Sequence, residues 1–195
     1  MVSDIGIVLL AAGEASRFGS AKQAALIDDM PLVHRAAVTA VQTSAVVTVV
    51  LGAHCSDIEP LLDGLDVSIT FNPQWYDGLG SSIAWGVHQL TQQHRGLSAV
   101  MLCLADQPLI DANDLQQLID VHRLDPESII AASFADVLGP PCLFPRGDIN
   151  ALLGLSGPQG ARVLLQRHAE RVRSVPMPHA AVDIDTPDDL ARLLR

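Results

Sequence analysis

Short apolar runs alternate with segments of helical pattern along most of the chain. Each run is rich in aliphatic and β-branched residues and is bounded by turn residues, which is typical of a strand inside a sheet. Helical segments separate successive runs, and this order predicts an α/β protein with a mostly parallel sheet. The expected strands are Ile5–Leu10, Val46–Leu51, Val67–Phe71, Ala99–Leu104, Ser128–Ser133, Val172–Val175 and Val182–Asp185.

Capping residues mark several of the helices expected between these strands. Asp111 caps a helix that runs to about His122, and Thr186 caps a last helix that Pro187 opens. The two aspartates that follow Pro187 favour the N-terminus of that helix. The other expected helices run from Pro31 to about Thr43, from a capping box at Ser56–Glu59, from Gly80 to about Gln92, and around Ala161–His168.

The second half of the chain has a less regular pattern. After Gly139, three prolines bracket a short apolar piece, Cys142–Phe144. We find no internal repeat, low-complexity tract or linker. With 195 residues, 49% of them hydrophobic and 17% charged, the chain can bury one sizeable core and does not have the composition of a disordered protein. We therefore expect a single domain over residues 1–195.

Charge and targeting signals narrow the class of protein. The net charge of −10 argues against broad binding to nucleic acids or anionic membranes, because both require basic surface. The three cysteines and the scattered histidines show no metal-binding spacing. We see neither a signal peptide nor an apolar run long enough to span a membrane, so we expect a soluble cytoplasmic protein.

The loop after the first strand combines small residues with two cations. Ala11, Ala12 and Gly13 leave bare backbone against which a ligand can lie, and Gly13 and Gly19 can adopt positive φ. Arg17 and Lys22 supply the positive charge that a polyphosphate requires. An ordinary loop with two solvated cations is the alternative. The combination in one short segment favours phosphate binding.

Two later segments of the chain carry aspartates that can bind a cation. Asp106 ends a very apolar strand, at the sheet edge where ligands of open α/β sheets bind, and suits a hard cation such as Mg²⁺. A turn cap helped by Pro108 is the alternative. Asp183 and Asp185 fall on one face of the expected strand and repel each other unless a cation or water separates them.

A third segment joins a strand to a helix whose N-terminus carries Ser81 and Ser82. Free N–H groups at a helix N-terminus attract anions, although either serine can equally serve as an ordinary cap. His34, on the helix after Pro31, is either a base-reading residue or an exposed helix residue.

These segments resemble motifs of a known family. Residues 10–22, LAAGEASRFGSAK, resemble the L-A-A-G-x-S-x-R-M-G-x-x-K signature of nucleotidyltransferases built on a Rossmann-like sheet. Residues 102–108 resemble their Asp-x-Pro strand end, and residues 182–190 the D-I-D-T-P-E-D-L run of molybdenum-cofactor cytidylyltransferases. Residues 71–82 resemble N-P-x-W-x-x-G-x-x-S-S, residues 139–144 resemble G-x-P-x-L-F, and residues 157–162 resemble G-D-x-G-A-R. Two departures are Pro158, in place of an acid, and Ala24–Ala25, in place of leucines.

The matches span nearly the whole chain and identify it as a member of the MobA-like superfamily, favouring the molybdenum-cofactor cytidylyltransferase branch. The resemblance implies a three-layer Rossmann-like fold of the nucleotide-diphospho-sugar transferase type. It implies an N-terminal half that binds the nucleotide and a C-terminal half that binds the acceptor. CTP would be the donor and molybdenum-loaded molybdopterin the acceptor, and a partner in molybdoenzyme maturation stays open.

The resemblance also implies which residues form the site. Mg²⁺ would be held by Asp106 with one of Asp183 and Asp185, of which Asp185 lies nearer the strand end. Arg17, Lys22 and Asp106 would be catalytic. The nucleotide would bind to Leu10, Ala11, Ala12, Gly13, Arg17, Gly19 and Lys22, and the acceptor to Asn72, Gly78, Ser81 and Ser82.

Three other functions compete with this interpretation. One is a nucleotidyltransferase that uses another nucleotide or a sugar-phosphate acceptor. Another is a non-catalytic nucleotide-binding regulator or chaperone, against which the set of Arg17, Lys22, Asp106 and Asp185 argues. A dinucleotide oxidoreductase is disfavoured, because no G-x-G-x-x-G follows the first strand.

Overall fold

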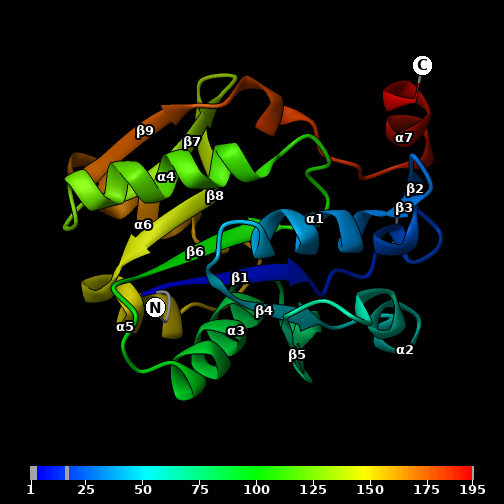
Figure 1. Ribbon diagram of the computed structural model, residues 1–195, viewed down its shortest axis with the longest axis horizontal. Helices are drawn as coiled ribbons and strands as arrows, with labels where there is room; N and C mark the ends of the chain where they lie inside the picture. Colours follow the sequence, from blue (N-terminus) through cyan, green and yellow to red (C-terminus); the bar gives the residue numbers. More distant parts are fainter. Residues whose placement is uncertain (1–3, 16–17, 195) are drawn as a thin grey trace.

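The computed structural model describes residues 4–15 and 18–194. Its centre is a seven-stranded sheet with the order β5-β4-β1-β6-β8-β7-β9 (Figure 1). Neighbouring strands are parallel except at β8, which is antiparallel to both β6 and β7. The strands are β1 (Ile5–Ala11), β4 (Val46–Leu51), β5 (Ser68–Phe71), β6 (Ala99–Leu104), β7 (Ile129–Phe134), β8 (Val137–Pro145) and β9 (Val172–Pro176).

Helices cover both faces of this sheet, which gives the expected three layers (Figure 1). One face carries α1 (Leu32–Val41), α2 (Cys55–Ile58) and α4 (Ala112–Leu124), and the other carries α3 (Leu79–Gln93), α5 (Ile149–Leu153) and α6 (Arg162–Arg167). The last helix, α7 (Pro187–Leu193), packs beside a separate hairpin of β2 (Leu26–Ile27) and β3 (Met30–Pro31). Short 3-10 helices lie at Lys22–Ala24, Glu59–Leu62, Trp75–Asp77, Arg146–Asp148, Ala169–Arg171 and Pro178–Ala181. The expectation of a mostly parallel three-layer fold is confirmed.

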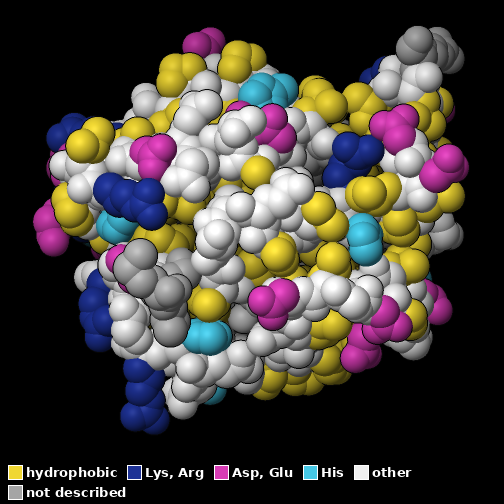
Figure 2. All heavy atoms as spheres, in the orientation of Figure 1, with side chains coloured by type: hydrophobic (Ala, Val, Ile, Leu, Met, Phe, Trp, Pro, Cys, Tyr) yellow, Lys and Arg dark blue, Asp and Glu magenta, His cyan; other side chains and the backbone are white. Residues whose placement is uncertain are grey.

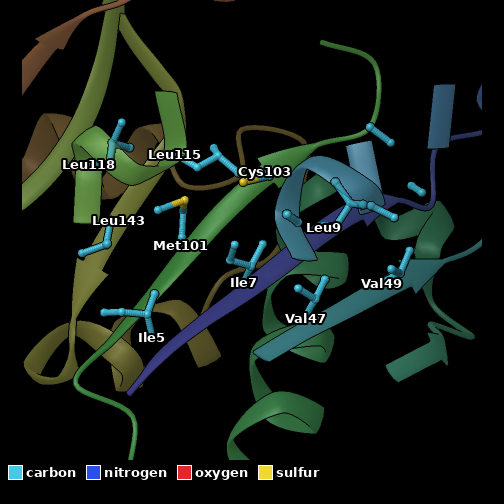
Figure 3. Close-up of a cluster of buried hydrophobic side chains, with 14 of the residues drawn as sticks. Ile5, Ile7, Leu9, Val47, Val49, Met101, Cys103, Leu115, Leu118 and Leu143 are labelled. Carbon is cyan, nitrogen blue, oxygen red and sulfur yellow. The ribbon is translucent and has the colours of Figure 1, made fainter. Parts of the chain in front are cut away.

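The central strand β1 is buried along its whole length. Ile5, Ile7 and Leu9 pack into the cluster under α1 and α4 (Figure 3), whereas Val8 and Leu10 pack into the cluster under α3. Side chains of a strand alternate between the two faces, so a strand covered on both faces must be apolar throughout. This explains why the first strand appears in the sequence as an unbroken apolar run.

Two of the expected helix starts are confirmed in atomic detail. Asp111 and Asp114 form a capping box at α4, and Thr186 and Asp189 form another at α7. The expected capping box at Ser56 is wrong. The N–H groups of Asp57 and Ile58 bond to the His54 carbonyl, so the helix begins before Ser56, and its first turn has no side-chain cap.

Two of the expected strands also need correction. The short piece Cys142–Phe144 is part of the nine-residue strand β8, whose prolines lie inside the sheet. Val182–Asp185 is not a strand. Its backbone bond toward the sheet is a single one, from Ile184 N–H to the Asp106 carbonyl at 2.9 Å, and one bond does not make a ladder. The expected alternation of buried and exposed side chains is nevertheless present, since Ile184 is buried while Asp183 is exposed.

Two hairpins turn through residues with left-handed backbone. Asp28 and Asp29 join β2 to β3, and Ala135 and Asp136 join β7 to β8, all four with positive φ. Two-residue hairpin loops favour this conformation because it matches the twist of the strands. Separately, none of the helices in the described ranges has the length and apolar character that crossing a bilayer requires.

Candidate active site

A cleft of about 300 Å³ lies at the carboxyl ends of β1 and β6. These strands are parallel neighbours, in register from Ile5 opposite Ala99 to Leu10 opposite Leu104, so the loops that follow them meet. Ligands of open α/β sheets bind at this edge. The residues that line the cleft are Leu10, Ala11, Ala12, Gly13, Glu14, Lys22, Gln23, Trp75, Tyr76, Gly78, Leu79, Ser82, Leu104, Ala105 and Asp106.

Lys22 is the only lysine in the chain, and it lies between two of the predicted metal ligands. Its Nζ donates to Asp106 Oδ2 at 2.7 Å and to Asp185 Oδ1 at 2.8 Å. The Lys22 side chain is 12% exposed. Burial alone would lower the pKa of the ammonium, but the charges and hydrogen bonds of Asp106 and Asp185 outweigh it and raise the pKa above its usual value.

The same carboxylates fit a hard cation. Asp106 Oδ1 is buried and has no hydrogen-bond partner in the described part of the chain, which leaves one carboxylate oxygen available to a ligand. Carboxylate oxygens are the ligands that Mg²⁺ prefers, and Mg²⁺ usually takes one or two of them together with substrate phosphates. No group of three or more acidic, histidine or cysteine side chains among the described residues is arranged to hold a metal ion unaided. The donors therefore suit a cation that arrives with a phosphate.

Asp183 and Asp185 are not equivalent in the structure. Asp185 is half-buried and contacts Lys22, whereas Asp183 is exposed. Partial burial, together with the negative charges of Asp185 and Asp106, raises the pKa of the Asp183 carboxyl. Asp185 is thus the better placed of the two to act with Asp106.

The backbone after β1 is held by a residue that the sequence analysis missed. Gln23, only 3% exposed, donates from Nε2 to the carbonyls of Ala11 at 3.0 Å and Gly13 at 2.9 Å. Ala53 N–H bonds to the Ala12 carbonyl in addition. The small residues of the loop therefore form a fixed wall of the cleft. A polar residue directly after Lys22, in an alanine-rich segment, was the available signal.

The rest of the predicted nucleotide loop is only partly in place. Leu10 to Gly13 line the cleft, but Gly13 does not use the positive φ that glycine allows. Gly19 does, at φ 79°, in a turn where its N–H bonds to the Ala15 carbonyl, and it is not among the residues that line the cleft. Arg17 lies outside the described residues.

Only two of the four predicted acceptor residues reach the cleft. Gly78 and Ser82 line it, whereas Asn72 and Ser81 do not. Asn72 is buried and donates from Nδ2 to the hydroxyls of Ser81 and Ser82, both at 3.1 Å, while its Oδ1 accepts from Gln74 N–H. Asn72 and Ser81 therefore position the loop and the start of α3 around the cleft.

His34 is neither a cleft residue nor an exposed one. It is half-buried, and its Nδ1 lies 2.7 Å from the Leu61 carbonyl oxygen. This contact ties α1 to the segment after α2. His34 does not line the cleft, so no contact in the described chain supports base reading by it.

Comparison with known proteins agrees with this geometry. Residues 7–172 match the model of the MobA-like NTP transferase domain. The chain is 29% identical over 200 residues to nicotine blue oxidoreductase of Paenarthrobacter nicotinovorans, covering 96% of this chain and 95% of that one. It is 33% identical over 115 residues to the purine catabolism protein PucB of Bacillus subtilis, covering 57% of this chain. That match spans about half of PucB, 54% of its length.

Solved structures share the whole architecture. Rv0371c from Mycobacterium tuberculosis H37Rv is 28% identical, with a TM-score of 0.81 over 98% of each chain. A second structure of Rv0371c, in complex with manganese, is 27% identical, with a TM-score of 0.78 over 98% of each chain. The family match over most of the chain, the shared fold and the cleft at the ends of β1 and β6 lead to one conclusion. The chain belongs to the MobA-like NTP transferase family.

Proposed function

We propose that this protein is a Mg²⁺-dependent nucleotidyltransferase that transfers CMP from CTP to the phosphate of molybdenum-loaded molybdopterin and releases pyrophosphate. The observation that carries the proposal is the contact of Lys22 with both Asp106 and Asp185 at the edge of the cleft. It brings one cation and two carboxylates, from three distant parts of the chain, to the place where a triphosphate can lie against backbone.

The reaction requires positioning and charge neutralisation. An oxygen of the acceptor phosphate forms a bond to the α-phosphorus, and the bond from that phosphorus to the bridging oxygen breaks. Both electrons of the broken bond leave with pyrophosphate. No protein nucleophile is needed, because the acceptor supplies the attacking oxygen. The protein must hold both phosphates in line and stabilise the negative charge that builds up.

We assign these tasks to residues in and around the cleft. The loop from Leu10 to Gly13 lies along the triphosphate, and Lys22, with Arg17, neutralises charge on the phosphates and the leaving group. The acceptor approaches from the C-terminal half, past the wall that contains Gly78 and Ser82. Gln23 holds the carbonyls of Ala11 and Gly13 and so keeps this loop in one conformation.

Asp106 and Asp185 would hold the Mg²⁺ ion, which supplies positive charge to the reacting phosphates when bound. The buried, unpartnered Oδ1 of Asp106 supports this assignment. The choice of CTP and of a molybdopterin acceptor rests on the likeness of residues 182–190 and 139–144 to the cytidylyltransferase motifs.

Pyrophosphate release is the direct test. We would supply Mg²⁺ and each of CTP, GTP, ATP and UTP, with and without molybdenum-loaded molybdopterin. Release that requires both CTP and the pterin is the expected result. Release with a sugar phosphate instead would assign another acceptor, and nucleotide binding without turnover would assign the non-catalytic regulator.

Asp106→Asn should reduce release by about 100-fold or more, as expected when a preorganised charged group is removed from a reacting phosphate site. Asp120→Asn, an exposed change on α4, is the matched control and should leave release unchanged. Wild-type turnover in folded Asp106→Asn would contradict the assignment of Asp106.

A further inference from the structure

Gln107, which directly follows Asp106, connects the turn after β6 to two other parts of the chain. The residue is 6% exposed, and its Nε2 donates to the carbonyls of Pro140 at 3.0 Å and Ala180 at 2.8 Å. A primary amide carries two N–H groups on one nitrogen, so each carbonyl receives one of them. The sequence analysis missed this glutamine, because the resemblance at residues 102–108 assigns a role to the aspartate alone.

The first of these bonds helps to fix Asp106. Pro140 belongs to β8, which pairs with β6, so the bond anchors the turn to the sheet. On the other side of Asp106, the Ala105 N–H donates to the Leu10 carbonyl at the end of β1, at 3.1 Å. Asp106 therefore lies between two neighbours that are fixed to the strands on either side of β6.

The second bond acts on the segment that leads to Asp185. Ala180 lies in this segment, which contacts the Asp106 turn at a further point, where the Ile184 N–H donates to the Asp106 carbonyl at 2.9 Å. Ala180 is 2% exposed and Ile184 is 0% exposed. Two hydrogen bonds therefore hold the segment against the turn before Asp185, and the capping box of α7 holds the chain after it.

One amide nitrogen thus supports the backbone of both carboxylates in the candidate site. Each carboxylate accepts a hydrogen bond from Lys22 Nζ, at 2.7 Å for Asp106 and 2.8 Å for Asp185, so the ammonium group senses how far apart they lie. Gln107 does not line the cleft, so a ligand there would not touch it. It can act on the site only through the backbone that it holds.

We propose that Gln107 is a positioning residue that sets the spacing between the carboxylates of Asp106 and Asp185. The inference rests on the proposed function, since that function assigns the metal ion to this pair. Replacement of residues that orient metal ligands without touching the metal typically lowers metal affinity or activity by about 10- to 100-fold. We therefore expect replacement of Gln107 to weaken the carboxylate pair and to leave the nucleotide wall of the cleft intact.

Gln107→Met tests the proposal, because methionine is flexible and apolar and has no N–H group to donate. Two NMR measurements require neither metal nor nucleotide. Exchange of the Ile184 amide with solvent should become at least about tenfold faster, since the segment loses one of its two bonds to the turn. Exchange of the Lys22 ammonium protons should also become faster, because the separated carboxylates no longer hold them together. The Asp189 amide, which donates to Thr186, is the internal reference and should be unaffected.

Catalysis and metal binding supply further measurements. At saturating Mg²⁺, Gln107→Met should lower kcat for pyrophosphate release from CTP by about 10- to 100-fold. The KM for CTP should change by less than about twofold, because no residue that lines the cleft is altered. The affinity for Mn²⁺ in the presence of CTP, measured by electron paramagnetic resonance, should fall by about the same factor as kcat.

Control variants separate positioning from loss of stability. Gln117→Met, the same substitution at an exposed residue of α4, should change none of these values. Ile119→Val removes a buried methyl group from the same helix, so it should lower stability while Lys22 exchange and kcat stay as in the wild type. If Gln107→Met does not fold, Gln107→His carries the same measurements. The neutral histidine ring keeps one N–H donor, so its effects should be smaller and in the same directions.

The outcomes distinguish this inference from the proposed function. If the wild type neither releases pyrophosphate nor binds Mn²⁺, while both exchange rates rise in Gln107→Met, the proposed function is wrong and the positioning role stands. If the wild type turns over CTP and Lys22 exchange is the same in both proteins, the positioning role is wrong and the proposed function stands. Faster exchange at Ile184 alone, with kcat unchanged, would show that Gln107 only stabilises the segment, and would also overturn the proposal.

Discussion

Lys22 sets the charge balance of the cleft. It is the one cationic side chain among the described residues that line the cleft, and Glu14 and Asp106 line it as well. Its ammonium group lies between two carboxylates, Asp106 and Asp185, and offsets one of their two negative charges. Under the proposed function, a bound triphosphate would give the same ammonium phosphate oxygens as new partners, and the carboxylates would become available to a cation.

Because Lys22 is the only lysine, lysine-selective isotope labelling gives a single side-chain ammonium signal for an NMR titration. We expect its pKa to lie above the usual value of lysine in the wild type. In Asp106→Asn the pKa should fall, because the stronger of the two raising partners is lost while burial continues to lower it. In Asp120→Asn it should be unchanged. An unchanged pKa in Asp106→Asn would contradict the contact.

Replacement of Asp183 by asparagine should change the stability of the protein, whereas replacement of Asp185 should change metal binding. The pKa of Asp183 is raised in the folded protein, so ionisation of this group reduces stability as pH rises above the usual pKa of aspartate. Asp183→Asn should therefore stabilise the protein at neutral pH by less than about 1 kcal/mol, because solvent screens the exposed side chain. The gain should vanish in acid, as followed by urea unfolding.

Binding of Mn²⁺, measured by electron paramagnetic resonance in the presence of CTP, distinguishes the two aspartates further. Asp183→Asn should retain it and Asp185→Asn should lose it. The reverse pattern would assign the metal to Asp183.

At the scale of single residues, the sequence predicted residues of the candidate site but not their contacts. Lys22, Asp106 and Asp185 were each predicted because each lies next to an apolar run or inside a motif. Their meeting was not predictable, because 84 and 163 residues separate Lys22 from its partners. Gln23 and Gln107 were missed because a buried glutamine has the same letter as an exposed one, and only the fold reveals what it holds.

At the scale of elements, the β7–β8 hairpin turns through a residue with strained backbone. Its loop is Ala135 and Asp136, with φ of 45° and 61°. Aspartate tolerates the left-handed region, but alanine is strained there because its Cβ crowds the backbone. The hydrogen-bond ladder between β7 and β8 therefore keeps Ala135 in a backbone conformation that alanine disfavours.

Ala135→Gly should raise the free energy of unfolding by about 0.5–1 kcal/mol, since relief of left-handed strain exceeds the added flexibility of the unfolded chain. Ala84→Gly, in the middle of α3, is the matched control and should lower it by about 1 kcal/mol. Urea unfolding of both variants measures the two values. A destabilised Ala135→Gly would show that the turn is not strained.

Helices and strands were predictable where interactions between residues close in sequence determine their ends. The caps of α4 and α7 involve residues three apart, so sequence alone specifies them. The prediction of a strand at Val182–Asp185 was wrong because an alternation of apolar and polar residues does not reveal whether the segment lies beside a strand with an unpaired edge. The full length of β8 was missed because prolines, which weaken a strand signal, are accommodated here by the packing of the sheet.

At the scale of the whole molecule, acidic side chains gather over the end that carries α2, the β2–β3 hairpin and α7 (Figure 2). The strands β1 and β4 point toward this end (Figure 1). With a net charge of −10, the protein as a whole repels polyanions. Under the proposed function, binding of a triphosphate would therefore depend on local cations, Lys22 above all, and on a metal ion that accompanies the nucleotide.

His122 gives the folded molecule a dependence on pH. Its side chain on α4 is 4% exposed, and Nδ1 has no hydrogen-bond partner in the described part of the chain. Burial lowers its pKa, and the opposing charge of Asp4 does not cancel this. Below the usual pKa of histidine the unfolded chain takes up a proton that the folded protein resists, so stability falls as pH falls.

As pH falls from about 7.5 to about 5.5, a range that includes the usual pKa of histidine, the free energy of unfolding should therefore decrease less for His122→Gln than for the wild type. Urea unfolding at both pH values measures this difference. His88→Gln, at an exposed residue of α3, should behave as the wild type does. Identical pH dependence in His122→Gln and wild type would contradict the prediction.

The layered fold was predictable as a whole because strand and helix alternate so regularly. The sheet order was not, because nothing in the local pattern tells that the antiparallel strand β8 lies between β6 and β7. The chain first forms β7, then returns through β8 between β6 and β7, and later adds β9 beside β7 at the edge of the sheet.

The single hydrogen bond from Ile184 to Asp106 also bears on the order in which a newly made chain acquires its site. Asp185 follows all seven strands of the sheet in sequence, so ribosomal synthesis delivers it after the last strand has been made. A nascent chain that stops short of residue 185 contains every strand and still lacks the second carboxylate. Synthesis past residue 185 is thus a condition for the carboxylate pair to which we assign the metal ion, and shorter nascent chains cannot form that pair.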